Sequence, residues 1–177
     1  MSPYLHLRAV GNGRQIEETV RFYLIDRVDE IHPGEGARGI KNIAMSDDIL
    51  RDHFPENPIF PGTLIVESLA QLGGFLVEAT FNKNKKDVRR AVLAQIEKAK
   101  FHEPCRPGDQ LRLECRLVSS LEGAAQIEGE AQVNGTKVAR ATLTFVLRKV
   151  DSKAVHEQRK DLYKQWTRGL KLKFPIL

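Results

Sequence analysis

A histidine and a glutamate fourteen positions apart, His53 and Glu67, are the side chains in this sequence best suited to moving protons. Histidine is the usual general base near neutral pH, and a carboxyl group removed from water can serve as a general acid. Each residue alone has an ordinary structural interpretation, since a glutamate early in a helix often only complements the helix dipole. Their joint occurrence in one short segment, HFPENPIFPGTLIVE, favours a proton-transfer site.

The loop that carries His53 is stiffened by proline. Pro55, Pro58 and Pro61 fix their own φ angles and push the preceding residues toward extended backbone, so the loop can hold a side chain in one place. Gly62 follows, and its backbone can approach a ligand closely because it has no side chain. A helix that begins here offers free N–H groups and the positive end of its dipole, which together bind an anion or a developing oxyanion.

The sequence from about Gly62 to Thr80 predicts a long buried helix, because its apolar residues cover more than one stripe. Glu67, Gln71 and Glu78 interrupt the apolar surface and argue against an integral membrane segment. On such a helix we expect Glu67 to be desolvated, which raises the pKa of a carboxyl group. Gln71 lies one turn further on, where it can orient Glu67.

The remaining patterns predict mostly strands, so the chain has the composition of an α+β fold. Ser46 is a candidate cap for a short helix through Leu50, and Asn134-Gly135 is a strong hairpin signal. Residues 1–17 are expected to be irregular, with a turn at 11–13, and residues 82–86 to form a polar loop. Strands are expected near residues 19–31, 36–45, 88–100, 109–120, 123–133 and 136–149.

The C-terminal stretch, residues 151–177, predicts an amphipathic helix. Its apolar residues fall near helical spacing, with lysine and arginine between them. Packing against the domain or a neighbouring subunit is the preferred interpretation, and a basic helix lying on a membrane surface is the alternative. The apolar positions are Val155, Leu162, Tyr163, Trp166 and Leu170.

Composition narrows the classes of protein. The net charge is +5 in 177 residues, but the basic residues are spread along the chain without the motifs of a nucleic-acid binder. Such a charge can steer an acidic partner. Cys105 and Cys115 fit no metal-ligand spacing, and the five histidines are scattered, so no metal site is expected. No apolar leader follows Met1, so we expect a cytoplasmic protein, in which the two cysteines stay reduced.

The run HFPENPIFPGTLIVESLAQ resembles the active-site segment of the 3-hydroxyacyl-[acyl-carrier-protein] dehydratases of the FabZ type. The segments FYLIDRV at 22–28 and IEKAKF at 96–101 also resemble strands of that family, so the likeness covers about residues 18–150. It implies a hot-dog fold, in which a curved antiparallel sheet wraps around one long helix. On this basis we expect an irregular segment at 1–17, a dehydratase domain at 18–150 and a helical extension at 151–177.

The resemblance also implies roles for single residues. His53 matches the catalytic histidine, and Glu67 matches the catalytic acid supplied by the other subunit of a homodimer with shared sites. Gly62 matches the glycine whose N–H holds the thioester carbonyl, while Phe60 and Gln71 belong to the substrate-binding set. The implied reaction removes water from 3-hydroxyacyl chains in fatty-acid or related lipid synthesis and needs no metal or cofactor.

The partner implied by the resemblance is an acyl carrier protein, and dimers of this family can assemble into a trimer of dimers. Carrier proteins are acidic, and the family uses basic residues near its tunnel mouth to bind them. The candidates in this chain are Lys98, Lys100, Arg106, Arg148 and Lys149.

The sequence departs from the family pattern at two positions. Glu56 stands where glycine is frequent, which adds a charge near the site. Val92 stands where many members carry a tyrosine or phenylalanine that lines or gates the acyl tunnel, which puts the usual chain-length behaviour in doubt. Two alternatives to a dehydratase are a hot-dog thioesterase and a non-catalytic acyl-binding subunit, and the presence of both His53 and Glu67 argues against the second.

Overall fold

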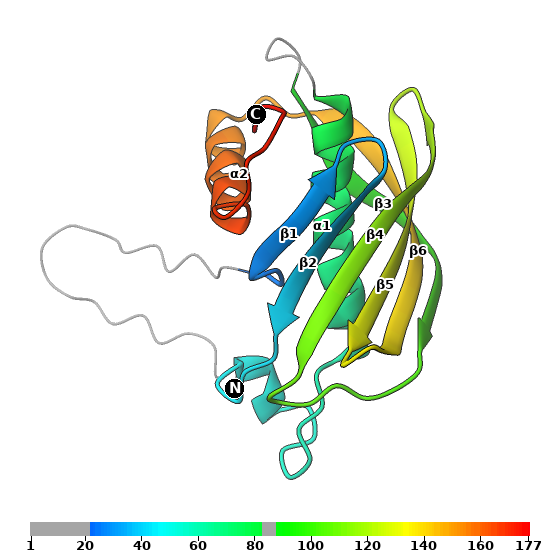
Figure 1. Ribbon diagram of the computed structural model, residues 1–177, viewed down its shortest axis with the longest axis vertical. Coiled ribbons are helices and arrows are strands. Elements are labelled where there is room, and N and C mark those ends of the chain that lie inside the picture. The colour runs from blue at the N-terminus through cyan, green and yellow to red at the C-terminus, as the bar shows by residue number, and fades with distance from the viewer. Residues whose placement is uncertain (1–21, 83–87) are drawn as a thin grey trace, which may run out of the picture.

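The computed structural model describes residues 22–82 and 88–177, which form a six-stranded antiparallel sheet packed against a long helix (Figure 1). The strand order is β1-β2-β4-β5-β6-β3, so β1 and β3 are the two edges. The elements are β1 (Arg27–His32), β2 (Gly36–Asn42), η1 (Asp48–Arg51), α1 (Gly62–Phe81), β3 (Arg89–Phe101), β4 (Gln110–Leu121), β5 (Ala124–Val133), β6 (Thr136–Lys149) and α2 (Lys153–Trp166).

Helix α1 is the centre of the hydrophobic core. Leu69, Leu72 and Leu76 have no exposed surface, and they form one core cluster with buried side chains of the sheet. By length and composition α1 is apolar enough to cross a membrane, yet 67% of its most apolar stretch is buried inside the protein. The helix is therefore the core helix around which this domain is built, and the predicted hot-dog arrangement is confirmed.

The strands from residue 88 onward lie where the sequence predicted them. The hairpin between β5 and β6 shows why a local sequence signal was sufficient. Asn134 and Gly135 both have positive φ angles, 49° and 82°, which is the backbone of a type I′ turn. This turn matches the twist of the strands that it joins, and Val133 pairs with Thr136 across it.

Two predictions nearer the N-terminus were wrong. The first strand begins at Arg27 rather than at residue 19, because Gln71 of α1 binds the preceding segment: its Oε1 accepts from Leu24 N at 3.0 Å and its Nε2 donates to Phe22 O at 3.1 Å. The short helix is η1, which follows Asp47 rather than a Ser46 cap. The expected irregular segment and its turn at 11–13, and most of the polar loop at 82–86, lie outside the described residues.

Helix α2 packs on the domain, as preferred from the sequence. Ser152 caps it by accepting a hydrogen bond from Val155 N at 3.4 Å. On its apolar face Leu162, Tyr163 and Trp166 are buried, and the Tyr163 ring stacks on Phe75 of α1 with centroids 4.1 Å apart. The apolar face of α2 is thus occupied by the core, which removes the reason for placing this helix on a membrane.

Candidate active site

His53 is held in a defined orientation in the loop between η1 and α1. Its Nδ1 lies 2.6 Å from the carbonyl oxygen of Ile59, so Nδ1 carries the proton and donates it to that oxygen. The other ring nitrogen, Nε2, is then left with a free lone pair. Phe54 beside it adopts a φ of 63°, unusual for a bulky residue, and the two rings pack with centroids 4.6 Å apart.

The loop is joined to the sheet where α1 begins. Phe60 N donates to Cys105 O at 2.8 Å, and the Phe60 side chain, only 2% exposed, lies in the core. Phe60 therefore anchors the loop in the core, and its expected role in substrate binding remains a prediction. Gly62 starts the helix against the ring of Phe101, where an added Cβ would come within 2.8 Å of two ring carbons. A larger residue at this position would have to displace the Phe101 ring.

Glu67 lies in the second turn of α1 at the wall of a cavity of about 570 Å³. The expected contact with Gln71 is present: Gln71 Nε2 donates to Glu67 Oε1 at 3.0 Å. Because Gln71 also binds Phe22 O and Leu24 N, its amide is fixed and can present only a donor to the carboxylate. One expectation fails, since Glu67 is partly exposed to this cavity and is not enclosed in the core.

His53 and Glu67 of the same chain do not share a cavity. The hollow beside Glu67 is bounded by residues at the start of the described chain, by Gln71 and by α2, and His53 is not part of its wall. A single chain therefore presents the two groups at separate places, a positioned imidazole in the loop before α1 and a positioned carboxylate on α1.

A second carboxylate on α1, Glu78, was not singled out by the sequence and proves to be the buried one, at 3% exposed. Arg90 Nη1 donates to its Oε2 at 2.7 Å, and Ala91 N donates to its Oε1 at 3.0 Å. Burial, followed by the Glu78 charge, raises the pKa of Tyr163 well above its usual value, so this phenol stays neutral. The only sequence signal was the spacing of eleven residues, about three helical turns, between Glu67 and Glu78.

The five basic candidates for carrier binding do not form one surface. Lys98 and Lys100 pair with Thr142 and Arg140, whereas Arg148 pairs with Arg90 near the other end of β3. Along β6, Arg148 is six residues from Thr142, the residue opposite Lys98, so the two groups are roughly 20 Å apart. Arg106 lies in the connection between β3 and β4, where its guanidinium donates to the Asn57 side chain in the loop of His53. Lys149, next to Arg148, belongs to the distant group.

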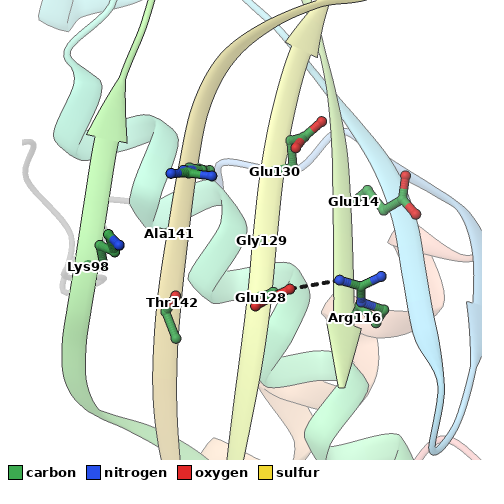
Figure 2. Close-up of a pocket in the computed structure, with 9 residues that line it drawn as sticks. Lys98, Glu114, Arg116, Glu128, Gly129, Glu130, Ala141 and Thr142 are labelled. Atoms are coloured by element: carbon green, nitrogen blue, oxygen red, sulfur yellow. Dashed lines mark hydrogen bonds and ion pairs between the residues drawn. The ribbon is translucent and has the colours of Figure 1, made fainter. Parts of the chain in front are cut away.

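Lys98 opens onto a hollow of about 380 Å³ on the face of the sheet that points away from α1 (Figure 2). The wall carries charges of both signs, and Arg116 and Glu128 form an ion pair of 2.7 Å across β4 and β5. Both side chains of this pair are largely exposed, so the pair is solvated and contributes little to stability.

Edge strand β3 carries exposed apolar side chains. Val92, Ile96 and Phe101 are 45%, 50% and 53% exposed, and the strand pairs only with β6 among the described residues. Val92, where the family often has an aromatic gate, is thus on the surface of the single chain. The two cysteine thiols are buried and form no disulfide, and burial raises the pKa of Cys105 to about 11. Within residues 22–82 and 88–177 no cluster of ligands for a metal ion occurs.

Comparisons with known proteins agree on fold and family. A family model described as a FabA-like domain matches residues 17–142. The chain is 40% identical over 125 residues to the 3-hydroxyacyl-[acyl-carrier-protein] dehydratase FabZ of Syntrophotalea carbinolica, covering 71% of this chain and 84% of the relative. It is 42% identical over 125 residues to the protein of the same name from Clostridium acetobutylicum, covering 70% and 86%.

Among solved structures, the fold is similar to that of smu.793 from Streptococcus mutans bound to acetyl CoA. The TM-score is 0.57 at 17% identity, over 78% of this chain and 100% of that one. At this level of identity the likeness concerns the fold alone.

Proposed function

We propose that this chain removes water from its substrate with His53 as base and Glu67 of a second subunit as acid. The chain belongs to the FabA-like family and is a 3-hydroxyacyl-[acyl-carrier-protein] dehydratase. The product is a trans-2-enoyl-[acyl-carrier-protein], and the reaction serves fatty-acid synthesis. We expect it to take place in the cytoplasm.

In the first half of the reaction, His53 Nε2 takes the proton from the α-carbon of the substrate. The hydrogen bond from Nδ1 to Ile59 O supports this role, because it leaves Nε2 as the acceptor and stabilises the imidazolium that forms. Charge that develops on the thioester oxygen is met by the Gly62 N–H at the start of α1.

In the second half, the bond between the β-carbon and its oxygen breaks, and Glu67 donates the proton that turns the leaving hydroxide into water. The C=C double bond forms from the electron pair of the lost C–H bond. The imidazolium then returns its proton through water to the Glu67 carboxylate, which restores both groups. The Gln71 amide, which donates to Glu67 Oε1, supports this role because it leaves Oε2 as the oxygen that carries the proton.

The observation that carries the proposal is that His53 and Glu67 of one chain lie at separate places. Glu67 is fixed by Gln71 at an open cavity, and His53 of the same chain does not reach that cavity. A second copy related by a two-fold axis can bring its own loop to Glu67 and complete two identical sites. Exposed Ile96 and Phe101 on edge strand β3 favour that strand as the contact between copies.

The proposed partner is an acyl carrier protein bearing the 3-hydroxyacyl chain. Arg106 contacts the loop of His53 through Asn57, and Lys98 and Lys100 lie in the part of β3 nearest the start of α1, where Phe101 meets Gly62. We therefore assign the carrier contact to these three residues and not to Arg148 and Lys149. Assembly of the dimers into a trimer of dimers remains a prediction.

Complementation between two inactive variants tests the shared site. His53→Ala and Glu67→Gln are purified, unfolded together in equal amounts and refolded, with each variant refolded alone as the control. Mixed dimers contain one site with both lesions and one with neither. If the subunits pair at random, half of the dimers are mixed, so activity should return to roughly a quarter of wild type.

No recovery in mixtures shown to contain mixed dimers would refute the shared site. The product distinguishes the alternative functions in the same assay. A dehydratase converts the 3-hydroxyacyl thioester to an enoyl thioester, a thioesterase releases free acid, and a binding subunit leaves the substrate unchanged.

A further inference from the structure

Helix α2 contributes to the cavity that contains Glu67, although it lies beyond the 17–142 region matched by the family model. It runs beside α1 and β1 (Figure 1). Val155, Gln158, Arg159 and Leu162 follow helical spacing, and all four line the cavity together with Glu67 and Gln71. This chain therefore adds a wall, partly polar, on the Glu67 side of the site.

The wall is firmly attached. Tyr163 and Trp166 pack on Phe75 of α1, with ring centroids 4.1 and 6.2 Å from it. At the start of α2, His156 Nε2 donates to Val150 O at 2.7 Å, which leaves Nδ1 to accept from Arg90 Nη2 at 2.8 Å. Side chains on the inner face of α2 are thus held at fixed positions relative to α1.

Arg159 is the side chain of this wall with unused binding capacity. It is partly buried, and among the described residues no hydrogen bond or ion pair engages its guanidinium. Two carboxylates line the same cavity: Glu67, whose Oε1 accepts from Gln71, and Asp161, which is largely exposed and lies 3.7 Å from Lys164. Among the described residues neither of them forms an ion pair with Arg159. Five N–H donors on a rigid planar group therefore face a cavity that also holds the proposed catalytic acid.

We propose that Arg159 is a specificity-determining residue of the dehydratase, selecting 3-hydroxyacyl chains that carry an additional oxygen function, a hydroxyl or a carboxylate, beyond the β-position. The inference rests on the proposed function, because it takes the Glu67 cavity as part of the active site. A plain alkyl chain in this cavity would remove water from the guanidinium without replacing its hydrogen bonds, which is unfavourable. An oxygen at the same place accepts charge-assisted hydrogen bonds.

The test compares two 3-hydroxyacyl thioesters of equal length, one ending in a methyl group and one in a carboxylate, on wild type and Arg159→Leu. Wild type should favour the carboxylate substrate in kcat/KM by about tenfold or more, the usual size of a charged hydrogen bond. Arg159→Leu should abolish or reverse that preference, and Arg159→Gln should fall between. Lys160→Leu is the control, since Lys160 lines a different hollow, bounded by the first turns of α2, Val88 and Leu177.

Binding measurements test the role of Arg159 independently of the proposed reaction. Calorimetry with His53→Ala, alone and combined with Arg159→Leu, measures the two dissociation constants without turnover. A preference for the carboxylate ligand that disappears with Arg159 supports the inference even if the reaction were of another type. Equal binding of both ligands by the protein with Arg159 intact, or a preference unchanged by Arg159→Leu in a folded protein, would overturn it and leave the roles of His53 and Glu67 standing.

Discussion

Two glutamates on the same helix, eleven residues apart, have opposite surroundings. Glu78 is 3% exposed, with both carboxylate oxygens engaged by Arg90 and the Ala91 N–H. Glu67 lies at an open cavity, and Gln71 engages one of its oxygens. The two side chains are chemically identical and lie on the same helix. Their different burial and hydrogen bonding therefore come from the residues that the rest of the fold places around each of them.

The comparison separates a structural carboxylate from the one that we propose to be reactive. A buried charge with every oxygen satisfied has no capacity left for a substrate, and its removal leaves its partner unpaired. A carboxylate with one oxygen oriented and the other open can exchange a proton with a bound molecule. Burial alone would have selected Glu78 as the functional group, whereas the unsatisfied hydrogen-bonding capacity selects Glu67.

The largest effect should come from removing the reactive carboxylate. Glu67→Gln should lower kcat by about 10²–10⁴-fold, the usual loss for a general acid, with little change in the free energy of unfolding. His53→Ala should show a loss of similar size. Steady-state kinetics and denaturant unfolding on the same samples measure both quantities. A folded Glu67→Gln protein with near-normal turnover would contradict the contrast drawn between the two glutamates.

The same substitution at Glu78 should have the opposite effect: a large loss of stability and a small change in kcat. Glu78→Gln removes the carboxylate that neutralises Arg90, although the guanidinium keeps its hydrogen bonds to His156 and Leu177 O. We expect the free energy of unfolding to fall by up to about 3–5 kcal/mol. Kcat per folded molecule should change far less than in Glu67→Gln. The double variant Glu78→Leu, Arg90→Met removes both charges and should regain part of the stability. A loss in the double variant as large as that in Glu78→Gln would show that the unpaired charge is not the cause.

The sequence predicted those parts of the fold in which local pattern decides structure. The apolar surface of α1 gave its bounds to within a residue at either end, and Asn134-Gly135 gave the hairpin because both residues tolerate positive φ. The start of the first strand was wrong because a residue distant in sequence, Gln71, binds Phe22 and Leu24 in place of a strand neighbour. Such a contact leaves no periodic signal.

In the site, too, features set by local sequence pattern were predictable, and features set by contacts between distant residues were not. The contact between Glu67 and Gln71 follows from helical spacing and was predictable, whereas the degree of burial of Glu67 and Glu78 was not. Arg90 and Tyr163 reach Glu78 from β3 and α2, and Arg159 reaches the Glu67 cavity from α2. The packing of β3 and α2 on α1 brings these residues together, and no local pattern in the sequence indicates it. The boundaries of the dehydratase domain at residues 18 and 150 remain predictions.

The smallest effect should come from Gln71, the residue that orients Glu67. Gln71→Leu removes the bond to Glu67 Oε1 and the bonds to Phe22 and Leu24. We expect kcat to fall by about tenfold with KM nearly unchanged, because a hydrogen bond to a charged group is worth about 1.5–3 kcal/mol and water can replace part of it.

Thr80→Val is the matched control for this change. Thr80 Oγ1 accepts a hydrogen bond from Gly34 N at 2.9 Å, so the variant also breaks a contact between α1 and a distant segment, but at the end of the helix remote from Glu67. Both variants should lose about 1–3 kcal/mol of stability, because each leaves a main-chain N–H without its partner. Only Gln71→Leu should lower kcat. Equal kcat values in the two variants would show that Gln71 contributes to folding alone, and that Glu67 is positioned by the second subunit instead.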